Sequence, residues 1–224
     1  MKKPAATRLD PPRNCSVCPR LASFRDANRT LYPGWHNAPV PSFGEPQARL
    51  LIVGLAPGLR GANCTGRPFT GDWAGDLLYE TLLAFDFATG VYDERPDDGL
   101  TLRDTMVTNA VRCVPPENKP TTTEIRDCRT FLESTIATNG QLNSIVALGR
   151  IAHDSVVRAL GEKLARAPFG HGAKHEIVAP DGRKLSLFDS YHCSRYNTNT
   201  GVLTPKMFQS VFRAVRAHLD KAGA

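Results

Sequence analysis

No long hydrophobic run occurs in this chain of 224 residues. Its longest apolar stretch, residues 50–59, is interrupted by Gly54, Pro57 and Gly58. A helix that crosses a bilayer needs about 20 consecutive apolar residues, so we expect neither a membrane-spanning segment nor a membrane partner. The basic N-terminus also has no apolar segment behind it, which predicts that no secretory signal peptide is present.

The proportions of apolar and charged residues are those of an ordinary globular protein. Apolar residues make up 41% of the chain and charged residues 22%, which excludes a disordered or fibrous protein. The 28 basic and 22 acidic residues leave a net charge of +6, which permits a polyanionic partner such as DNA without requiring one. Without a signal peptide, the six cysteines are expected in a reducing cytoplasm, as metal ligands or isolated thiols rather than disulfides.

Short apolar runs that alternate with helical periodicity predict an open α/β sheet with helices on both faces. Strands are predicted at residues 50–55, 105–111, 144–148 and 185–191, the last after a hairpin turn at Asp181 and Gly182. Helices are predicted over 75–87, behind a capping box of Thr121 and Glu124, and over 150–160. A last helix is predicted to begin at Pro205, with Thr204 as its cap. We expect one domain, 1–224, whose proline-rich first 48 or so residues form an irregular segment over the core.

Ligands of an open α/β sheet bind beyond the carboxyl ends of its strands. Three polar segments follow predicted strand ends, at residues 56–72, 109–118 and 192–199. The first is rich in glycine and proline, which indicates a backbone that approaches a ligand closely. It matches neither the dinucleotide fingerprint nor a P-loop. Its one aromatic residue, Phe69, either stacks on a planar base or folds back onto the core.

Four of the cysteines form two separated pairs. Cys15 and Cys18 make a C-x-x-C motif in a proline-flanked loop, whereas Cys113 follows the second predicted strand and Cys128 lies on the apolar face of the next helix. Four thiolates in two pairs suit a zinc ion or an iron–sulfur cluster. The alternative for the second pair is that both thiols are small buried hydrophobic groups.

Three motifs together resemble those of the bacterial and archaeal uracil-DNA glycosylases. They are GLAPG with GRPFTGD, TNAVRC followed by PPENKPT, and SYH followed by NTG, LTP and MF, with the four cysteines at matching places. The match covers nearly the whole chain and is closest to family 5, the thermophile-type B enzymes, with family 4 next. It implies a three-layer α/β/α fold with a central, mostly parallel sheet, and a [4Fe-4S] cluster.

The resemblance also implies an activity. Members of the family flip uracil out of DNA and hydrolyse its N-glycosidic bond, which leaves an abasic site. Hypoxanthine and xanthine are further expected substrates. We therefore expect a monofunctional DNA repair enzyme that acts as a monomer in a prokaryotic cytoplasm, with nucleoid-associated activity.

Individual roles carry over from the motifs as expectations. The cluster ligands would be Cys15, Cys18, Cys113 and Cys128. The substrate-binding residues would be Gly54, Phe69, Asn109, His192, Ser194 and Arg195. The catalytic residues would be Asp72, Asn109 and His192. Basic residues around the crevice, which are expected to hold DNA phosphates, are Arg60, Arg67, Arg112, Lys119 and Arg195.

The residue types suit this chemistry. Breaking the bond leaves positive charge on the sugar and negative charge on the base, so catalysis is mostly electrostatic. Asp72 suits the sugar cation or its attacking water, and a neutral His192 suits the leaving oxygen as a hydrogen-bond donor. The alternatives are that Asp72 caps the following helix, that Asn109 satisfies a buried backbone group, and that His192 is an ordinary loop histidine.

One position departs from the family pattern. The usual His-Pro-Ser is His192, Cys193 and Ser194 here, and cysteine is expected to leave this loop freer than proline does. A non-catalytic iron–sulfur protein that binds damaged DNA is therefore the alternative function. An iron–sulfur electron carrier ranks third, because the ligand spacing is not that of a ferredoxin.

Overall fold

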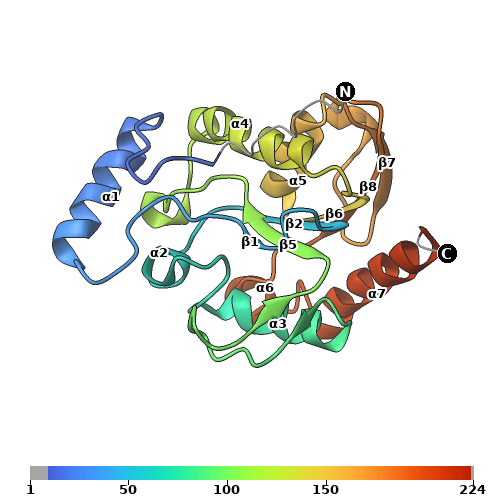
Figure 1. Cartoon of the computed structure of the whole chain (residues 1–224), viewed down its shortest axis with the longest axis horizontal. Coiled ribbons are helices and arrows are strands. Elements are labelled where there is room, and N and C mark those ends of the chain that lie inside the picture. The colour runs from blue at the N-terminus through green and yellow to red at the C-terminus, as the bar shows by residue number, and fades with distance from the viewer. Residues whose placement is uncertain (1–9, 223–224) are drawn as a thin grey trace, which may run out of the picture.

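The computed structural model describes residues 10–222. Its centre is a six-stranded sheet in the order β1-β5-β2-β6-β8-β7. The strands are β1 (Phe43–Gly44), β2 (Leu50–Gly54), β5 (Thr105–Asn109), β6 (Ser144–Leu148), β7 (Lys174–Val178) and β8 (Lys184–Ser190). The four central strands run parallel and the two edge strands antiparallel. The expected mostly parallel sheet is therefore confirmed (Figure 1).

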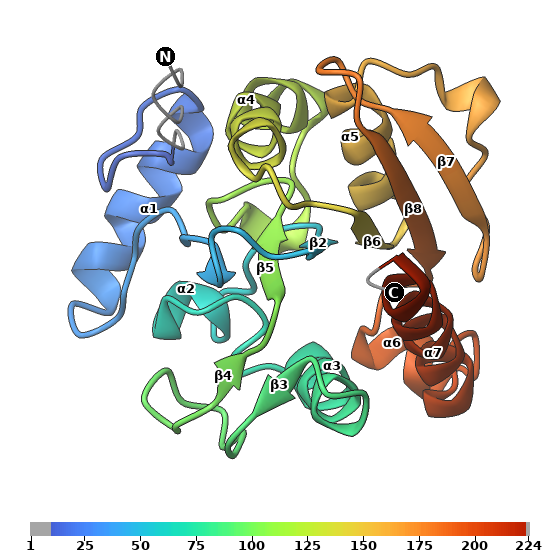
Figure 2. The ribbon, with the colours of Figure 1, turned by 45° about the vertical axis from the view of Figure 1, so that its right-hand side comes forward.

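Helices cover both faces of the sheet (Figure 2). They are α1 (Pro19–Leu31), α2 (Ala62–Thr65), α3 (Trp73–Ala84), α4 (Thr122–Thr138), α5 (Arg150–Ala159), α6 (Arg195–Asn199) and α7 (Pro205–Ala222). Leu132 of α4 and Val156 of α5 belong to the core on one face, whereas Leu78 of α3 and Phe212 of α7 belong to the core on the other. This is the predicted α/β/α architecture. None of the helices in residues 10–222 has the length and apolar character needed to cross a bilayer.

The remaining regular elements are short. A two-stranded sheet pairs β3 (Ala88–Thr89) with β4 (Thr101–Leu102). Single 3-10 turns occur at η1 (Pro116–Asn118) and η2 (Leu164–Arg166).

The predicted helix starts are present. The Thr121 hydroxyl accepts a hydrogen bond from the Glu124 amide at 3.2 Å, and the Glu124 carboxylate accepts one from the Thr121 amide at 2.7 Å. At α7, the Thr204 hydroxyl accepts from the Met207 amide at 3.2 Å. Such caps satisfy amides that the first helical turn leaves unpaired, so sequence alone locates these two boundaries.

The expectation of an irregular N-terminal segment is wrong for residues 19–31, which form α1. The helix begins at Pro19, a position where proline costs no hydrogen bond. Its buried stripe is Leu21, Arg25 and Asn28, so two of its three inward residues are polar and apolar periodicity does not reveal it. Residues 1–9 of the predicted segment lie outside the described part of the chain.

The parallel register fixes where a site can form. Gly54 at the end of β2 pairs with Asn109 at the end of β5, and Leu148 at the end of β6 pairs with Ser190 at the end of β8. The three polar segments singled out in the sequence therefore leave the sheet at the same edge.

Candidate active site

Gly54, Phe69 and Asn109 meet at the carboxyl edge of the sheet. A side chain at Gly54 would collide with both the Phe69 ring and the Asn109 amide oxygen, so glycine is required there for the two to converge. Asn109 is buried, and its amide forms no hydrogen bond with any residue between 10 and 222. The residue lines the pocket at this edge, so its amide is available to a ligand there, which favours that role over the backbone group considered above.

Neighbouring residues hold the backbone of Phe69 in place. Its φ of +54° is rare for a residue with a bulky side chain. The Tyr92 hydroxyl donates to its carbonyl at 3.2 Å, and only glycine fits at Gly75, where a Cβ would collide with the same carbonyl. The ring packs in the core and also lines the pocket at the sheet edge. The ring thus packs onto the core, as one of the two readings expected, and its exposure to the pocket leaves stacking on a base as a prediction.

Asp72 lies just before α3, but its side chain makes no capping hydrogen bond. Among residues 10–222, no group hydrogen-bonds to its Oδ1, which is buried. Its Oδ2 faces Gly58, where a Cβ would be 3.0 Å away. Burial raises the pKa of this carboxyl, although the nearby amides of Gly75 and Ala74 act against the rise. The geometry therefore favours a role in the pocket over a role as a cap.

His192 faces Phe69 across the pocket. Their ring centroids are 6.1 Å apart with an interplanar angle of 28°. Its carbonyl accepts from the Asn197 amide at 2.8 Å, which fixes the backbone, while the imidazole has no hydrogen-bond partner in residues 10–222. Burial lowers the pKa of His192 to about 4, so the ring is neutral at pH 7. It is available as a hydrogen-bond donor.

These side chains line an inner pocket at the bottom of a larger cleft. The pocket is lined by Ala56, Pro57, Gly58, Ala62, Phe69, Asp72, Asn109 and His192. It holds about 30 Å³, the volume of one water molecule. The cleft above it measures about 680 Å³ and shares Ala56, Gly58, Asp72 and His192 with it. The Asp72 carboxylate and the His192 imidazole are therefore both accessible from the cleft.

The rim of the cleft is basic and aromatic. Ser194, which caps α6, and Arg195 both line it, as the sequence predicted, together with Arg60. Trp73 also lines it and was missed, although a tryptophan next to Asp72 was a usable signal. It is 48% exposed, the Arg195 guanidinium lies 5.5 Å from its ring centroid, and its Nε1 donates to the Thr198 hydroxyl at 2.9 Å.

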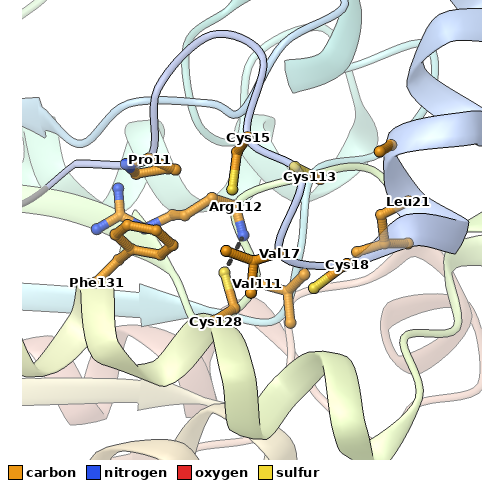
Figure 3. Close-up of a pocket in the computed structure, with 11 residues that line it drawn as sticks. Pro11, Cys15, Val17, Cys18, Leu21, Val111, Arg112, Cys113, Cys128 and Phe131 are labelled. Atoms are coloured by element: carbon orange, nitrogen blue, oxygen red, sulfur yellow. Dashed lines mark hydrogen bonds between the residues drawn. The ribbon is translucent and has the colours of Figure 1, made fainter.

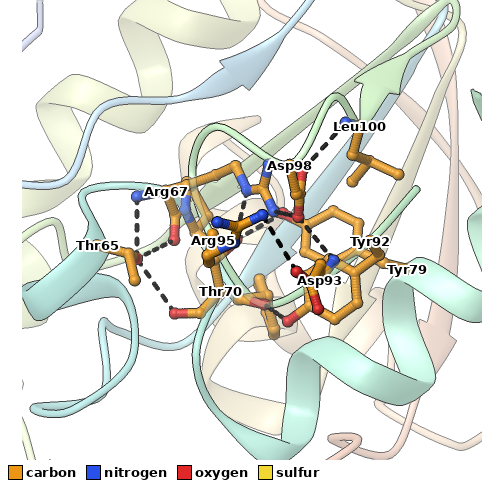
Figure 4. Close-up of polar contacts among 11 residues, drawn as sticks. Thr65, Arg67, Thr70, Tyr79, Tyr92, Asp93, Arg95, Asp98 and Leu100 are labelled. Atoms are coloured by element: carbon orange, nitrogen blue, oxygen red, sulfur yellow. Dashed lines mark hydrogen bonds and ion pairs between the residues drawn. The ribbon is translucent and has the colours of Figure 1, made fainter. Parts of the chain in front are cut away.

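Two of the arginines expected to hold DNA are buried, so that prediction is wrong for them. Arg112 is 1% exposed and donates to the hydroxyls of Ser42 and Thr135. Arg67 is 4% exposed and forms two hydrogen bonds with Asp98, at 2.8 and 2.6 Å (Figure 4). Both arginines stabilise the loops that carry the site, and neither is able to reach a phosphate.

Aromatic rings enclose the Arg67 guanidinium. It lies 5.2 to 5.7 Å from the ring centroids of Phe43, Tyr79 and Tyr92. Tyr79 donates to the Pro68 carbonyl, and Tyr92 to that of Phe69, so the same cluster holds the segment that carries the Phe69 ring (Figure 4). Hydrogen bonding by Arg67 holds the pKa of Asp98 well below its usual range, which keeps the pair ionised.

Cys193 is more tightly held than expected for a freer loop. It is completely buried, and its thiol donates to the Ala74 carbonyl at 3.4 Å. Ala74 belongs to α3, directly after Asp72 and Trp73. A buried side chain therefore restrains this loop at the position where the motif that the sequence resembles has proline.

Behind the cleft lies a buried cluster of His153, His175 and Asp189. The Asp189 carboxylate is 2.7 Å from Nδ1 of His153, and the Ala167 carbonyl is 2.8 Å from Nε2 of the same ring. Both partners accept hydrogen bonds, so both ring nitrogens donate and the ring is an imidazolium. Burial opposes this charge, but the hydrogen bond and charge of Asp189 raise the pKa of His153. With both nitrogens occupied, His153 is not free to bind a metal.

The two cysteine pairs come together at one pocket (Figure 3). Cys15 and Cys18 precede α1, Cys113 follows β5, and Cys128 lies on α4. The Arg112 amide donates to Cys128 Sγ at 3.3 Å. Burial, followed by the charge of Cys128, raises the pKa of Cys18 to about 11 and that of Cys113 to about 12. The thiols are thus close enough for the ionisation of one to oppose that of another.

Fold and site together define a three-layer α/β/α protein with a small pocket at the carboxyl edge of its sheet, lined by an aromatic ring, an amide, a carboxylate and an imidazole. The family model of the uracil DNA glycosylase superfamily matches residues 41–216. The chain is 42% identical over 202 residues to the type-5 uracil-DNA glycosylase of Thermus thermophilus, with 88% of this chain and 90% of that protein covered.

Two further relatives agree. The type-5 uracil-DNA glycosylase of Pyrobaculum aerophilum is 38% identical over 208 residues, which cover 91% of this chain and 88% of that protein. The type-4 uracil-DNA glycosylase of Archaeoglobus fulgidus is 31% identical over 154 residues, which cover 68% and 69%. The chain therefore belongs to the uracil DNA glycosylase superfamily, within its type-5 branch.

Proposed function

We propose that this chain is a DNA repair glycosylase that flips uracil out of DNA and hydrolyses its N-glycosidic bond, leaving an abasic site. The observation that carries the proposal is the convergence of Phe69, Asp72, Asn109 and His192 on one inner pocket. The names of its type-5 relatives support the same activity. Such an enzyme must extrude the nucleotide because the bond is inaccessible inside a stacked duplex.

Recognition of the base is assigned to Phe69 and Asn109. The Phe69 ring offers a flat surface, and stacking of a base on an aromatic ring contributes about 1–3 kcal/mol. The unpartnered amide of Asn109 offers both a donor and an acceptor to the base edge. Because the inner pocket holds only about 30 Å³, a base enters only if side chains at its mouth move.

Charge stabilisation is assigned to Asp72 and His192. As the bond breaks, the ionised carboxylate stabilises the positive sugar or positions the attacking water, and the neutral imidazole donates to the leaving oxygen of the base. Both groups lack hydrogen-bond partners in the described residues, the carboxylate at its Oδ1. Both groups are therefore available to interact with the charges that develop as the bond breaks. The same slot suits other deaminated bases, and we propose hypoxanthine and xanthine as further substrates.

We also propose that Cys15, Cys18, Cys113 and Cys128 hold a [4Fe-4S] cluster. Four thiols line one pocket, and a backbone amide donates to one of the sulfurs. Four thiolates suit a zinc ion as well as an iron–sulfur cluster, and the resemblance to the glycosylase family is what favours the cluster. Hydrolysis of the glycosidic bond is not a redox reaction. The cluster would therefore have a structural role, in which it links α1, α4 and the loop after β5.

The activity is tested with duplexes that each contain one deoxyuridine, deoxyinosine or deoxyxanthosine. Alkali treatment after incubation should break the strand at the modified position. An intact strand with all three substrates would exclude the glycosylase, and lesion-selective binding without base release would identify a damage-binding protein instead. We place this activity on the DNA of a prokaryotic cytoplasm, close to the nucleoid, and expect a monomer.

The cluster is tested by comparing Cys128→Ser with Cys64→Ser. Cys64 is a half-buried thiol outside the quartet. We expect the purified wild type and Cys64→Ser to contain about four irons and to absorb in the visible range. Cys128→Ser should lose both the iron and thermal stability. Equal iron content in all three proteins would contradict the assignment.

A further inference from the structure

A second groove lies on the rim that carries the cleft, between α4 and α5. It measures about 260 Å³. Its lining residues are Pro120, Thr122, Ile125, Arg129, Ile151, Asp154, Ser155 and Arg158. Neither the family resemblance nor the proposed chemistry gives these residues a role.

Two arginines in this groove lack partners. The guanidinium groups of Arg129 and Arg158 form no hydrogen bond or ion pair with any residue between 10 and 222. Nε of Arg129 is buried and unsatisfied. Burial lowers the pKa of Arg129, and the nearby charge of Arg158 lowers it further. Two like charges beside one another, one of them partly desolvated, are stabilised by an anion between them.

The carboxylates nearby do not supply that anion. Asp154 lines the groove one turn before Arg158, and Glu133 lies one turn after Arg129. The charge of Glu133 acts on Arg129, but no ion pair forms between either carboxylate and either arginine. Arg126 shows the contrast, because its guanidinium lies 2.8 Å from Asp127. The groove therefore leaves room for an anion from outside the chain.

The groove is continuous with the cleft. It shares Ile151 with an intervening pocket of about 310 Å³, whose other lining residues include Leu55 and His192. Both of these also line the cleft. On the other side, the cleft reaches Asn118 and the groove begins at Pro120. A DNA strand whose flipped nucleotide lies at His192 is thus placed to run along this surface towards the two arginines.

We propose that Arg129 and Arg158 bind a backbone phosphate of the strand that carries the flipped nucleotide. This inference rests on the proposed function and adds a phosphate site outside the cleft. A guanidinium matches the geometry of phosphate oxygens and keeps its charge at any physiological pH. A phosphate contact contributes affinity and salt dependence but no base preference, so the site serves every base that the inner pocket admits.

The test is the salt dependence of binding to a single-stranded oligonucleotide with a central abasic analogue, which requires no catalysis. The double variant Arg129→Gln, Arg158→Gln is compared with wild type and with Arg103→Gln. Arg103 is exposed, lies just before the amino end of β5 at the opposite edge of the sheet, and forms hydrogen bonds through its backbone only, within the described residues. Thermal unfolding of all three proteins shows whether the substitutions leave the fold intact.

For the double variant we expect binding to the oligonucleotide to be weaker by roughly fivefold to tenfold at low salt. The slope of log K for binding against the logarithm of the salt concentration should be smaller by about 0.7, because one phosphate contact is lost. Arg103→Gln should match the wild type. Trimming the oligonucleotide from one of its two ends should weaken the wild type and leave the double variant unchanged. An unchanged salt slope in the double variant would overturn the proposal.

Two further measurements separate the competing explanations. In the first, suppose that inorganic phosphate alone raises the melting temperature of the wild type but not of the double variant, while the two proteins have the same salt slope for DNA binding. That result would mean that the two arginines bind a free anion, and it would refute the DNA site. Excision of uracil by the double variant at saturating DNA should equal that of the wild type. If no protein excises uracil, the proposed function fails, whereas the salt slopes still decide the phosphate site.

Discussion

The rings of Phe69 and His192 face each other at the bottom of the cleft, with centroids 6.1 Å apart and planes inclined by 28°. One ring comes from the loop between β2 and α3, and the other from the segment after β8. Phe69 is fixed by the core, whereas the His192 imidazole has no hydrogen-bond partner in the described residues. The fixed ring therefore suits recognition of the base, and the unpaired ring suits hydrogen bonding to it.

Replacing His192 with glutamine is expected to slow single-turnover excision of uracil about a hundredfold to a thousandfold, the typical effect of losing one aligned donor. Because burial holds the pKa of His192 near 4, the ring stays neutral between pH 5.5 and 8. The wild-type rate should show no step from His192 in that range and should fall only as the pH approaches 4. A step near pH 6.5 that is absent in His192→Gln would contradict this.

Replacing Asp72 with asparagine separates catalysis from helix capping, because asparagine caps as well as aspartate does. We expect the single-turnover rate to fall at least a hundredfold. Since burial raises the pKa of Asp72, its ionised form costs stability at neutral pH, and removing the charge should leave the melting temperature equal or higher. An unchanged rate together with a lower melting temperature would assign Asp72 a structural role instead.

Replacing Asp98 with asparagine should be among the most destabilising polar changes in the chain. It breaks an ion pair whose side chains are 4% and 0% exposed, which costs about 3–5 kcal/mol of unfolding free energy. Asp93→Asn is the control, because its partner Arg95 is largely exposed and the loss should stay below about 1 kcal/mol. Urea denaturation measures both values, and similar losses in the two variants would refute the prediction.

Replacing His153 with glutamine should destabilise the protein by about 3–5 kcal/mol at pH 6, because Asp189 loses its buried cation. The folded-state pKa of His153 lies above its unfolded value of about 6.5. Its stabilising effect is therefore complete below pH 6.5 and is lost as the pH rises through the folded-state pKa. Urea denaturation at pH 6 and pH 9 should show a smaller difference between variant and wild type at pH 9. Equal differences would mean that the ring is uncharged.

Sequence alone predicts the parts of this fold that local chemistry determines. The capping box of Thr121 and Glu124 and the cap at Thr204 are read directly, because each involves neighbouring residues. The apolar runs locate the four parallel strands within about two residues, since strands buried on both faces have few polar residues. The edge strand β1 and the pair of β3 and β4 are only two residues long each and leave no such pattern.

The site is predictable in its residues but not in its partners. The strand ends indicate that Asn109 and His192 share an edge of the sheet. The registers of Gly54 with Asn109 and of Leu148 with Ser190 place both residues there. That Arg67 pairs with Asp98 rather than with DNA depends on a contact across 31 residues, which no local pattern encodes. The same holds for the thiol of Cys193, whose partner is the carbonyl of Ala74, 119 residues away.

Phe69 belongs at once to the hydrophobic core and to the wall of the inner pocket. Any substitution that enlarges the pocket by shrinking this ring also removes apolar contacts from the core, and large-to-small core changes of this kind cost about 3–5 kcal/mol. Because the folding stability of proteins is marginal, few substitutions of Phe69 that would admit other damaged bases are tolerated. Adaptation to bulkier lesions is more accessible through the opposite wall, at His192, whose side chain is not part of this core.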